Sequence, residues 1–371
     1  MIYHVPSEGD VFSAYRGGAV IQIIANMMRF DPSSAVVCQS ADETWGYGAD
    51  RILIIPELRT FYKLKGRKYL PLWITGPFFR HIFQPFLSQL KGGDIVWCHN
   101  QPAMCAALAG IIHLKGARLI YHSHSSVAFY ARRSHFRAFV ADAWIFISKA
   151  MQQEALALFP WLQDSYVVHN AADDGLFYPR NDGNDGSNAV PVILYVGRLV
   201  PDKGVHVLIA TMKILQERKV KVLCKVVGSY AFGGSKTTLY VKSLLKSSPA
   251  NVQFEDWRSG KEIAEEYRAA DILCCPSIWQ EPFGNVNIEA MACGIPVVAT
   301  RVGGIPEIAA QGGVLLVEPN SAVELADALQ KLVEDKDLRA RVAQAGLQSF
   351  LRGFTWPTTI EQYRQIVKEM E

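Results

Sequence analysis

Two glutamates eight residues apart give this sequence its most informative chemical signal. Glu281 stands on a polar loop after an apolar run, and Glu289 lies within the segment Asn285 to Cys293, which ends at Gly294. This pattern predicts a helix whose first backbone N–H groups form a site for an anion. Because carboxylates accept hydrogen bonds from hydroxyls, the pair could hold diols beside that anion. The alternative is that Glu281 caps the helix and Glu289 is a solvated helical charge.

Two cations, Arg198 and Lys203, follow the apolar run Val192 to Val196, which is typical of a strand. Ligands of open parallel sheets bind beyond the carboxyl ends of the strands. A diphosphate leaving group gathers negative charge as its bond breaks, and a fixed Arg and Lys could stabilise that charge without a metal ion. The competing interpretation is two cations on a surface loop.

These two stretches together are similar to a known enzyme family. Gly197-Arg198-Leu-x-x-x-Lys203-Gly204, followed by Glu281-x-Phe-Gly-x-x-x-x-Glu289-Ala-x-Ala-x-Gly-x-Pro-Val-Val-Ala, resembles the retaining GT4 family of GT-B glycosyltransferases. The likeness covers most of the second half of the chain and parts of the first, through Ile147-Ser-Lys, Asn170-Ala-Ala-Asp173, Phe177-x-Pro179 and Gly303-Gly-Ile-Pro-Glu307.

The resemblance implies a donor site in the second half of the chain. Arg198 and Lys203 would hold the donor diphosphate, Glu281 would be the catalytic residue at the donor sugar, and Glu289 would bind the ribose. Backbone N–H groups at the beginning of the helix would complete these contacts, at Phe283, Gly284, Asn285 and Val286. The loop Phe254 to Arg258 lacks the glycine that relatives carry two residues after the Phe, and Trp257 and Arg258 are the nucleoside contacts we expect there.

In the first half, the resemblance implies a glycine-rich turn near the donor phosphate and a histidine near the reacting sugar. The turn corresponds to Gly17 and Gly18, with Arg16 on the acceptor side. His124 fits the histidine, as a second catalytic residue, and His122 is expected to point inward from a strand. A zinc site at this pair is disfavoured because no third ligand is expected nearby.

The literal Asp-x-Asp pattern of metal-dependent transferases occurs once, at Asp335-Lys-Asp337. It stands between two segments rich in Lys, Arg, Glu and Ala, which predicts a helix boundary on the surface. We therefore expect no metal site and no cofactor, with a nucleotide-diphosphate sugar as co-substrate of a metal-independent reaction.

Alternation of short apolar runs with amphipathic segments predicts the scaffold, an α/β fold of two Rossmann-like, doubly wound lobes facing a cleft. The polar, turn-forming stretch Asn181 to Ala189 is the predicted linker. The first lobe is then residues 1–180, on the acceptor side, and the second, the donor lobe, is 181–354. An amphipathic helix over 355–371 could pack back on the first lobe.

Charge is distributed unevenly although the net charge is only +3. Between Leu58 and Ala141 there are twelve Lys or Arg and one acid, Asp94. Within Phe61 to Phe86, cations are interleaved with aromatic residues: Lys63, Lys65, Arg67, Lys68 and Arg80 with Trp73, Phe78, Phe79 and Phe83. This predicts contact with an anionic membrane surface or with an anionic glycan, and a solvated basic surface is the alternative. No apolar run reaches the length of a spanning helix. A moderate pI without a recognition motif argues against nucleic-acid binding.

Seven cysteines in apolar runs, without a leader, indicate buried thiols and a cytoplasmic protein, at the inner face of the membrane if the basic surface binds lipid. The expected function is sugar transfer to a glycan or lipid-linked acceptor in polysaccharide or glycolipid synthesis. The alternatives are a GT-B nucleotide-sugar epimerase or hydrolase and a non-catalytic nucleotide-sugar-binding protein. A nicotinamide dehydrogenase ranks last because no Gly-x-Gly-x-x-Gly follows a strand.

Overall fold

The computed structural model describes residues 1–7, 12, 19–41, 47–59, 70–128, 137–162, 164–180, 189–229 and 238–370. These form two compact units, Met1–His169 with Ile360–Glu371 and Asn170–Thr359. Residues 181–188 of the predicted linker lie outside the described ranges. The units divide at His169, ahead of the boundary expected at residue 180, because segment 170–180 packs on the second unit. There, the Ala172 N–H donates to the Phe354 carbonyl and Phe177 contacts Tyr267.

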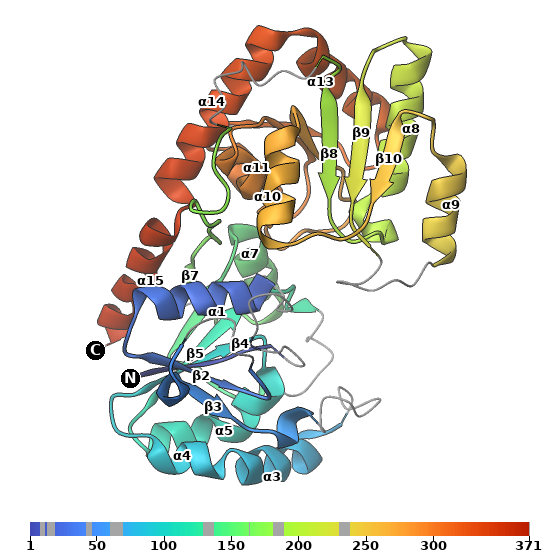
Figure 1. Cartoon of the computed structure of the whole chain (residues 1–371). Coiled ribbons are helices and arrows are strands. Elements are labelled where there is room, and N and C mark those ends of the chain that lie inside the picture. Colours follow the sequence, from blue (N-terminus) through green and yellow to red (C-terminus); the bar gives the residue numbers. More distant parts are fainter. Residues whose placement is uncertain are drawn as a thin grey trace. The chain divides into compact units, whose positions relative to one another are not determined.

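Unit 1 contains a seven-stranded parallel sheet of order β3-β2-β1-β4-β5-β6-β7. In Figure 1, α1 lies on one face of this sheet and α3, α4 and α5 lie on the other. The elements are β1 (Ile2–Val5), α1 (Ala19–Phe30), β2 (Ser34–Cys38), η2 (Ala49–Arg51), β3 (Ile52–Ile54), α3 (Leu72–Ile82), α4 (Gln84–Gln89), β4 (Ile95–His99), α5 (Pro102–Leu114), β5 (Arg118–Ser123), β6 (Ala143–Phe146), α7 (Lys149–Leu158), β7 (Ser165–Val167) and, from Ile360 onward, α15 (Trp356–Met370).

Unit 2 contains a six-stranded parallel sheet of order β10-β9-β8-β11-β12-β13. Its elements are β8 (Val192–Val196), η5 (Pro201–Lys203), α8 (Val205–Glu217), β9 (Leu223–Val227), α9 (Leu239–Ser247), β10 (Val252–Glu255), α10 (Gly260–Ala269), β11 (Ile272–Cys275), α11 (Asn285–Ala292), β12 (Val297–Thr300), α12 (Ile305–Ala309), β13 (Val314–Val317), α13 (Ala322–Glu334) and α14 (Lys336–Gly353).

The central strands of both sheets are apolar on both faces because helices cover both faces of a doubly wound sheet. β4, β6, β11 and β12 are buried along their whole length. All seven cysteines are free and buried in this setting, as their apolar neighbours predicted. Within the described ranges, the apolar run around Pro71 to Phe86 forms α3 and α4, and no helix has the length and hydropathy needed to cross a bilayer.

Candidate active site

The predicted donor residues gather at the carboxyl edge of the unit 2 sheet. The chain goes from β8 outward to β9 and β10 on one side and to β11, β12 and β13 on the other. The strand order therefore reverses between β8 and β11, and such a switch point is where open α/β sheets bind ligands. Lys203 lies on the connection after β8, and Glu281 lies on the connection after β11.

Lys203 and Glu281 form an ion pair across this switch point, although 78 residues separate them in the sequence. The carboxylate is nearly buried, at 6% exposure, and it also accepts a hydrogen bond from Ser277 Oγ at 2.7 Å. The ammonium group lies 5.4 Å from the centre of the Trp279 ring. Gly204, the residue after Lys203, has φ +70°, and any side chain at this position would overlap the Pro276 carbonyl. Close approach of the two connections thus brings Lys203 to Glu281.

The backbone of Glu281 is fixed by the turn that follows β12. The Gly304 N–H donates to the Glu281 carbonyl at 2.8 Å, and the Gly303 N–H donates to Gln280 Oε1 at 2.8 Å. Gly303 has φ +52°, and a Cβ there would collide with the Glu281 backbone. The conformation of the catalytic candidate therefore depends on a glycine on a different strand connection.

Helix α11 begins directly after this loop, with Gly284 as its N-cap in the left-handed region at φ +97°. Asn285 opens the helix, and its side-chain oxygen accepts from Asn170 Nδ2 at 2.8 Å. The backbone N–H groups of Asn285 and Val286 stand in the first turn, where helices have no internal acceptors. The Phe283 side chain is 1% exposed and packs near Phe354, so only its backbone is available to a ligand.

Glu289 lies in the second turn of α11, and one of its oxygens, Oε2, accepts from the Tyr267 hydroxyl at 2.7 Å. Burial raises the pKa of the Glu289 carboxyl, and the hydrogen bond from Tyr267 partly opposes that rise. Because Tyr267 holds Oε2, the orientation of the Glu289 carboxylate is fixed, and its other oxygen, Oε1, can accept from a ligand. A carboxylate so oriented suits the recognition of a diol.

Arg198 follows β8 and is exposed, with its carbonyl held by the Tyr195 hydroxyl at 2.8 Å. The two predicted nucleoside contacts are partly buried. Arg258 forms ion pairs with Glu255 and Glu266, each at 3.2 Å. The guanidinium is therefore occupied by carboxylates of its own unit, and a nucleoside would have to share it with them.

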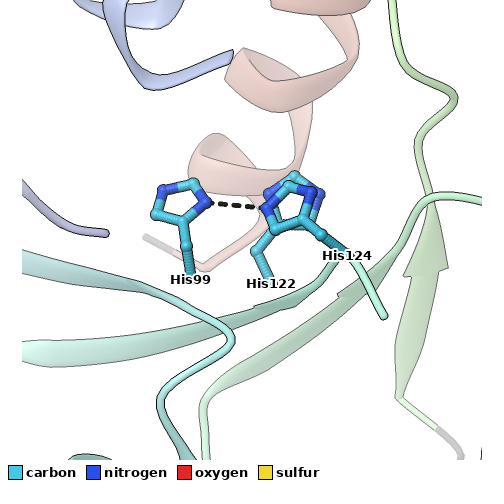
Figure 2. Close-up of side chains that lie close together, drawn as sticks. All are labelled: His99, His122 and His124. Atoms are coloured by element: carbon cyan, nitrogen blue, oxygen red, sulfur yellow. Dashed lines mark hydrogen bonds between the residues drawn. The ribbon is translucent and has the colours of Figure 1, made fainter. Parts of the chain in front are cut away.

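In unit 1, His124 follows β5 directly, and His122 points inward from that strand, as predicted. The expectation that no third ligand lies nearby was wrong, because His99 at the end of β4 contacts both. Figure 2 shows the three rings together. Arg16, Gly17 and Gly18 lie outside the described residues.

Asp335 and Asp337 stand at a helix boundary, which confirms the interpretation of the Asp-x-Asp pattern. Asp335 is the N-cap of α14, and its carboxylate accepts from the Leu338 N–H at 2.8 Å. Asp337 lies in the first turn of that helix, where a negative charge is favourable.

Sequence reasoning missed Ser277, Tyr267 and His99. Ser277 stands four residues before Glu281 on the same loop, so its position was a usable signal. Tyr267 and His99 have no such local signal, because each meets its partner through the packing of separate elements.

Comparison with known proteins agrees with this architecture. Residues 183–349 match the family described as Glycosyl transferases group 1. The chain is 32% identical over 247 residues to the alpha-maltose-1-phosphate synthase of Mycolicibacterium smegmatis, covering 62% of this chain and 64% of that protein. It is 36% identical over 215 residues to the D-inositol 3-phosphate glycosyltransferase of Corynebacterium efficiens, covering 55% of this chain and 50% of that protein. The chain thus spans about half to two thirds of these relatives.

Among solved structures, Anabaena HepE in complex with UDP matches with a TM-score of 0.77 at 21% identity, over 99% of each chain. Sucrose-phosphate synthase from Thermosynechococcus elongatus matches with a TM-score of 0.75 at 22% identity, over 100% of this chain and 98% of that one. The fold is therefore that of the two-lobed GT-B glycosyltransferases, as predicted. Residues 183–349 are thus similar to the group 1 glycosyltransferases.

Proposed function

We propose that this protein is a retaining glycosyltransferase that moves a sugar from a nucleotide-diphosphate sugar to a glycan or lipid-linked acceptor. The observation that carries the proposal is the partly buried Lys203–Glu281 pair at the switch point, together with the first turn of α11 and the Glu289–Tyr267 contact. The relative in the same fold, HepE, was solved with UDP and glucose, which supports a nucleotide-sugar ligand.

In the proposed reaction, the bond between the anomeric carbon and the diphosphate oxygen breaks, and the electron pair stays on the diphosphate. An acceptor hydroxyl forms the new bond to that carbon on the same face, and its proton passes to the departing diphosphate oxygen. Arg198, Lys203 and the first N–H groups of α11 would stabilise the developing anion. Glu281 would hold the sugar hydroxyls, Glu289 would hold the ribose diol, and His124 would contact the reacting sugar.

We expect transfer to continue in EDTA, because fixed cations are proposed to replace a metal ion at the diphosphate. The measurement is product formation by mass spectrometry from UDP-, GDP-, ADP- and TDP-sugars, with and without chelator. Glycosylated acceptor supports transfer. Free or epimerised sugar without glycosylated acceptor would point to a hydrolase or an epimerase instead. Binding of a nucleotide sugar without turnover would point to a binding protein. Loss of transfer in EDTA, restored by Mn²⁺ or Mg²⁺, would refute metal independence.

A second part of the proposal is contact between unit 1 and an anionic membrane. The cations Lys63, Lys65, Arg67 and Lys68 lie outside the described residues. Helix α3, which follows them, exposes 76% of Trp73 and 39% of Ile74 and carries Arg80 on its surface. Phe79 and Phe83, which the sequence suggested as membrane contacts, are core residues. A helix that exposes a Trp and an Arg is typical of a membrane interface.

We expect Trp73→Ala, and separately Gln at residues 63, 65, 67 and 68, to weaken binding to anionic vesicles. Each Lys or Arg near such a surface adds about 1 kcal/mol, so the four charges together matter most at low salt. Co-sedimentation with vesicles measures this, with Trp161→Ala as control because Trp161 is 56% exposed in the same unit. If wild type ignores anionic vesicles at low salt, the membrane proposal fails, and a raised acceptor KM in the Gln variant would favour an anionic acceptor.

A further inference from the structure

Four histidines lie close together on neighbouring strands of unit 1, and neither the predicted donor chemistry nor the fold accounts for all of them. His4 is on β1, His99 ends β4, and His122 is on β5, where it pairs in register with His99. His124 follows two residues later. Each of His99, His122 and His124 offers a ring nitrogen, and these three nitrogens lie within 4.8 Å of one another (Figure 2).

The contacts within this cluster suit either a proton or a metal ion between the rings. His99 Nδ1 faces His124 Nε2 at 2.9 Å, and His99 Nε2 faces His4 Nδ1 at 3.3 Å. Neither ring nitrogen of His122 has a hydrogen-bond partner among the described residues, although the side chain is completely buried. Since buried polar atoms nearly always have a partner, His122 calls for one that the neighbouring side chains do not supply.

All four rings are held in the neutral form, which is the form that binds metals. Burial lowers the pKa of His4 and of His124 to about 3. Burial and the neighbouring imidazoles lower the pKa of His99 and His122 well below the usual value. At neutral pH each ring therefore presents one lone pair. Among His99, His122 and His124, His124 is the most exposed, at 9%, so an ion can reach the cluster from the side of His124.

We propose that His99, His122 and His124 together bind one divalent transition-metal ion of the Zn²⁺ type. His99 would coordinate through Nδ1 and donate its Nε2–H to His4, which orients the ring as outer partners of metal ligands commonly do. Three imidazoles leave a fourth position for water or a substrate oxygen. Ligand nitrogens of tetrahedral zinc lie about 3.4 Å apart, given Zn–N bonds of about 2.0–2.1 Å. His99 Nδ1 and His124 Nε2 lie only 2.9 Å apart, so these two rings must move apart when the ion binds.

If the proposed function holds, a metal ion bound here occupies His124, the histidine proposed to contact the reacting sugar. Zn²⁺ then lowers the rate of sugar transfer, and EDTA restores it. This effect is opposite to that of a metal that serves the diphosphate. The cluster would then be an inhibitory site in unit 1 rather than part of the donor site in unit 2.

The test is Zn²⁺ calorimetry, and Co²⁺ absorption, on chelator-stripped full-length protein. We expect one ion per chain in wild type, binding at least about 100-fold weaker in His99→Gln, His122→Gln and His124→Gln, and about 10- to 100-fold weaker in His4→Gln. His113→Gln and His206→Gln are matched controls, because these exposed histidines have other partners, Asp142 and Tyr240. If a variant of one of the buried histidines does not fold, the binding of Zn²⁺ by His124→Gln and the Co²⁺ spectrum of the wild type decide whether the cluster holds the ion.

Failure to bind Zn²⁺ in wild type, or equal binding in the cluster variants, overturns the proposal and leaves a hydrogen-bonded histidine chain only. Thiolate bands in the Co²⁺ spectrum overturn it as well, because they would assign the ion to cysteines. The activity measurement compares transfer with and without Zn²⁺ in wild type and in His122→Gln. Stoichiometric binding without any transferase activity would contradict the proposed function and leave the metal site intact.

Discussion

Replacing Lys203 with alanine is expected to lower turnover about 10²- to 10³-fold, the usual scale for losing a positioned charge at a developing anion. The ammonium group stands at the switch point of unit 2, paired with Glu281. Arg198→Ala should cause a loss of similar size. Because Arg198 is exposed, that variant should change stability by less than about 0.5 kcal/mol, so its effect on rate is the cleaner measurement.

Steady-state kinetics with the best donor of the panel provide the measurement. Lys213→Ala is the matched control, since Lys213 is an exposed lysine on α8 of the same unit. Lys203→Ala also leaves the Glu281 carboxylate without its cation, so thermal unfolding is needed to normalise the rate to folded protein. Near wild-type turnover in both Arg198→Ala and Lys203→Ala would remove the donor diphosphate from this site.

Gly303→Ala is expected to destabilise unit 2 by several kcal/mol and to abolish most activity. A non-glycine residue in the left-handed region costs about 1–2 kcal/mol, and the steric conflict adds about 1–3 kcal/mol. The new methyl group would lie 2.6 Å from the Glu281 backbone nitrogen and closer still to its carbonyl oxygen. The strain therefore falls on the residue proposed to hold the donor sugar.

The variant Gly260→Ala separates the cost of the left-handed backbone conformation from the cost of the steric conflict. Gly260 has φ +54°, almost the same as the φ +52° of Gly303, but a Cβ there meets nothing within 4 Å. Denaturant unfolding and kinetics of the two variants should differ by the steric cost alone. Equal stability and equal activity would mean that the turn after β12 does not hold Glu281 in place.

The alternating pattern of the sequence predicted the two lobes because each crossover helix covers an apolar strand. Strand β8 has the same limits as the apolar run Val192 to Val196. The helix after Glu281 was predictable from Gly294 at its end and from the spacing of Glu289. The C-terminal amphipathic segment forms α15, and from Ile360 onward it groups with unit 1.

The sequence could not predict contacts between side chains that are distant in the chain and become neighbours only through the strand order of the fold. His99 and His122 are 23 residues apart, and only the pairing of β4 with β5 makes them neighbours. The same holds for Tyr267 on α10, which meets Glu289 on α11 only in the folded unit. The unit boundary at His169 depends on where segment 170–180 packs, and a polar linker downstream of it says nothing about that packing.

The return of α15 to unit 1 affects the order in which the protein can fold during synthesis. Tyr363 packs against Trp97 and His122, so these residues lack a neighbour until residues 360–370 have left the ribosome. All 190 residues of the second unit, 170–359, are made in between. At about 5–20 residues per second, that takes about 10–40 s. The later half of the chain can therefore reach its native state while the earlier half still waits for its last helix.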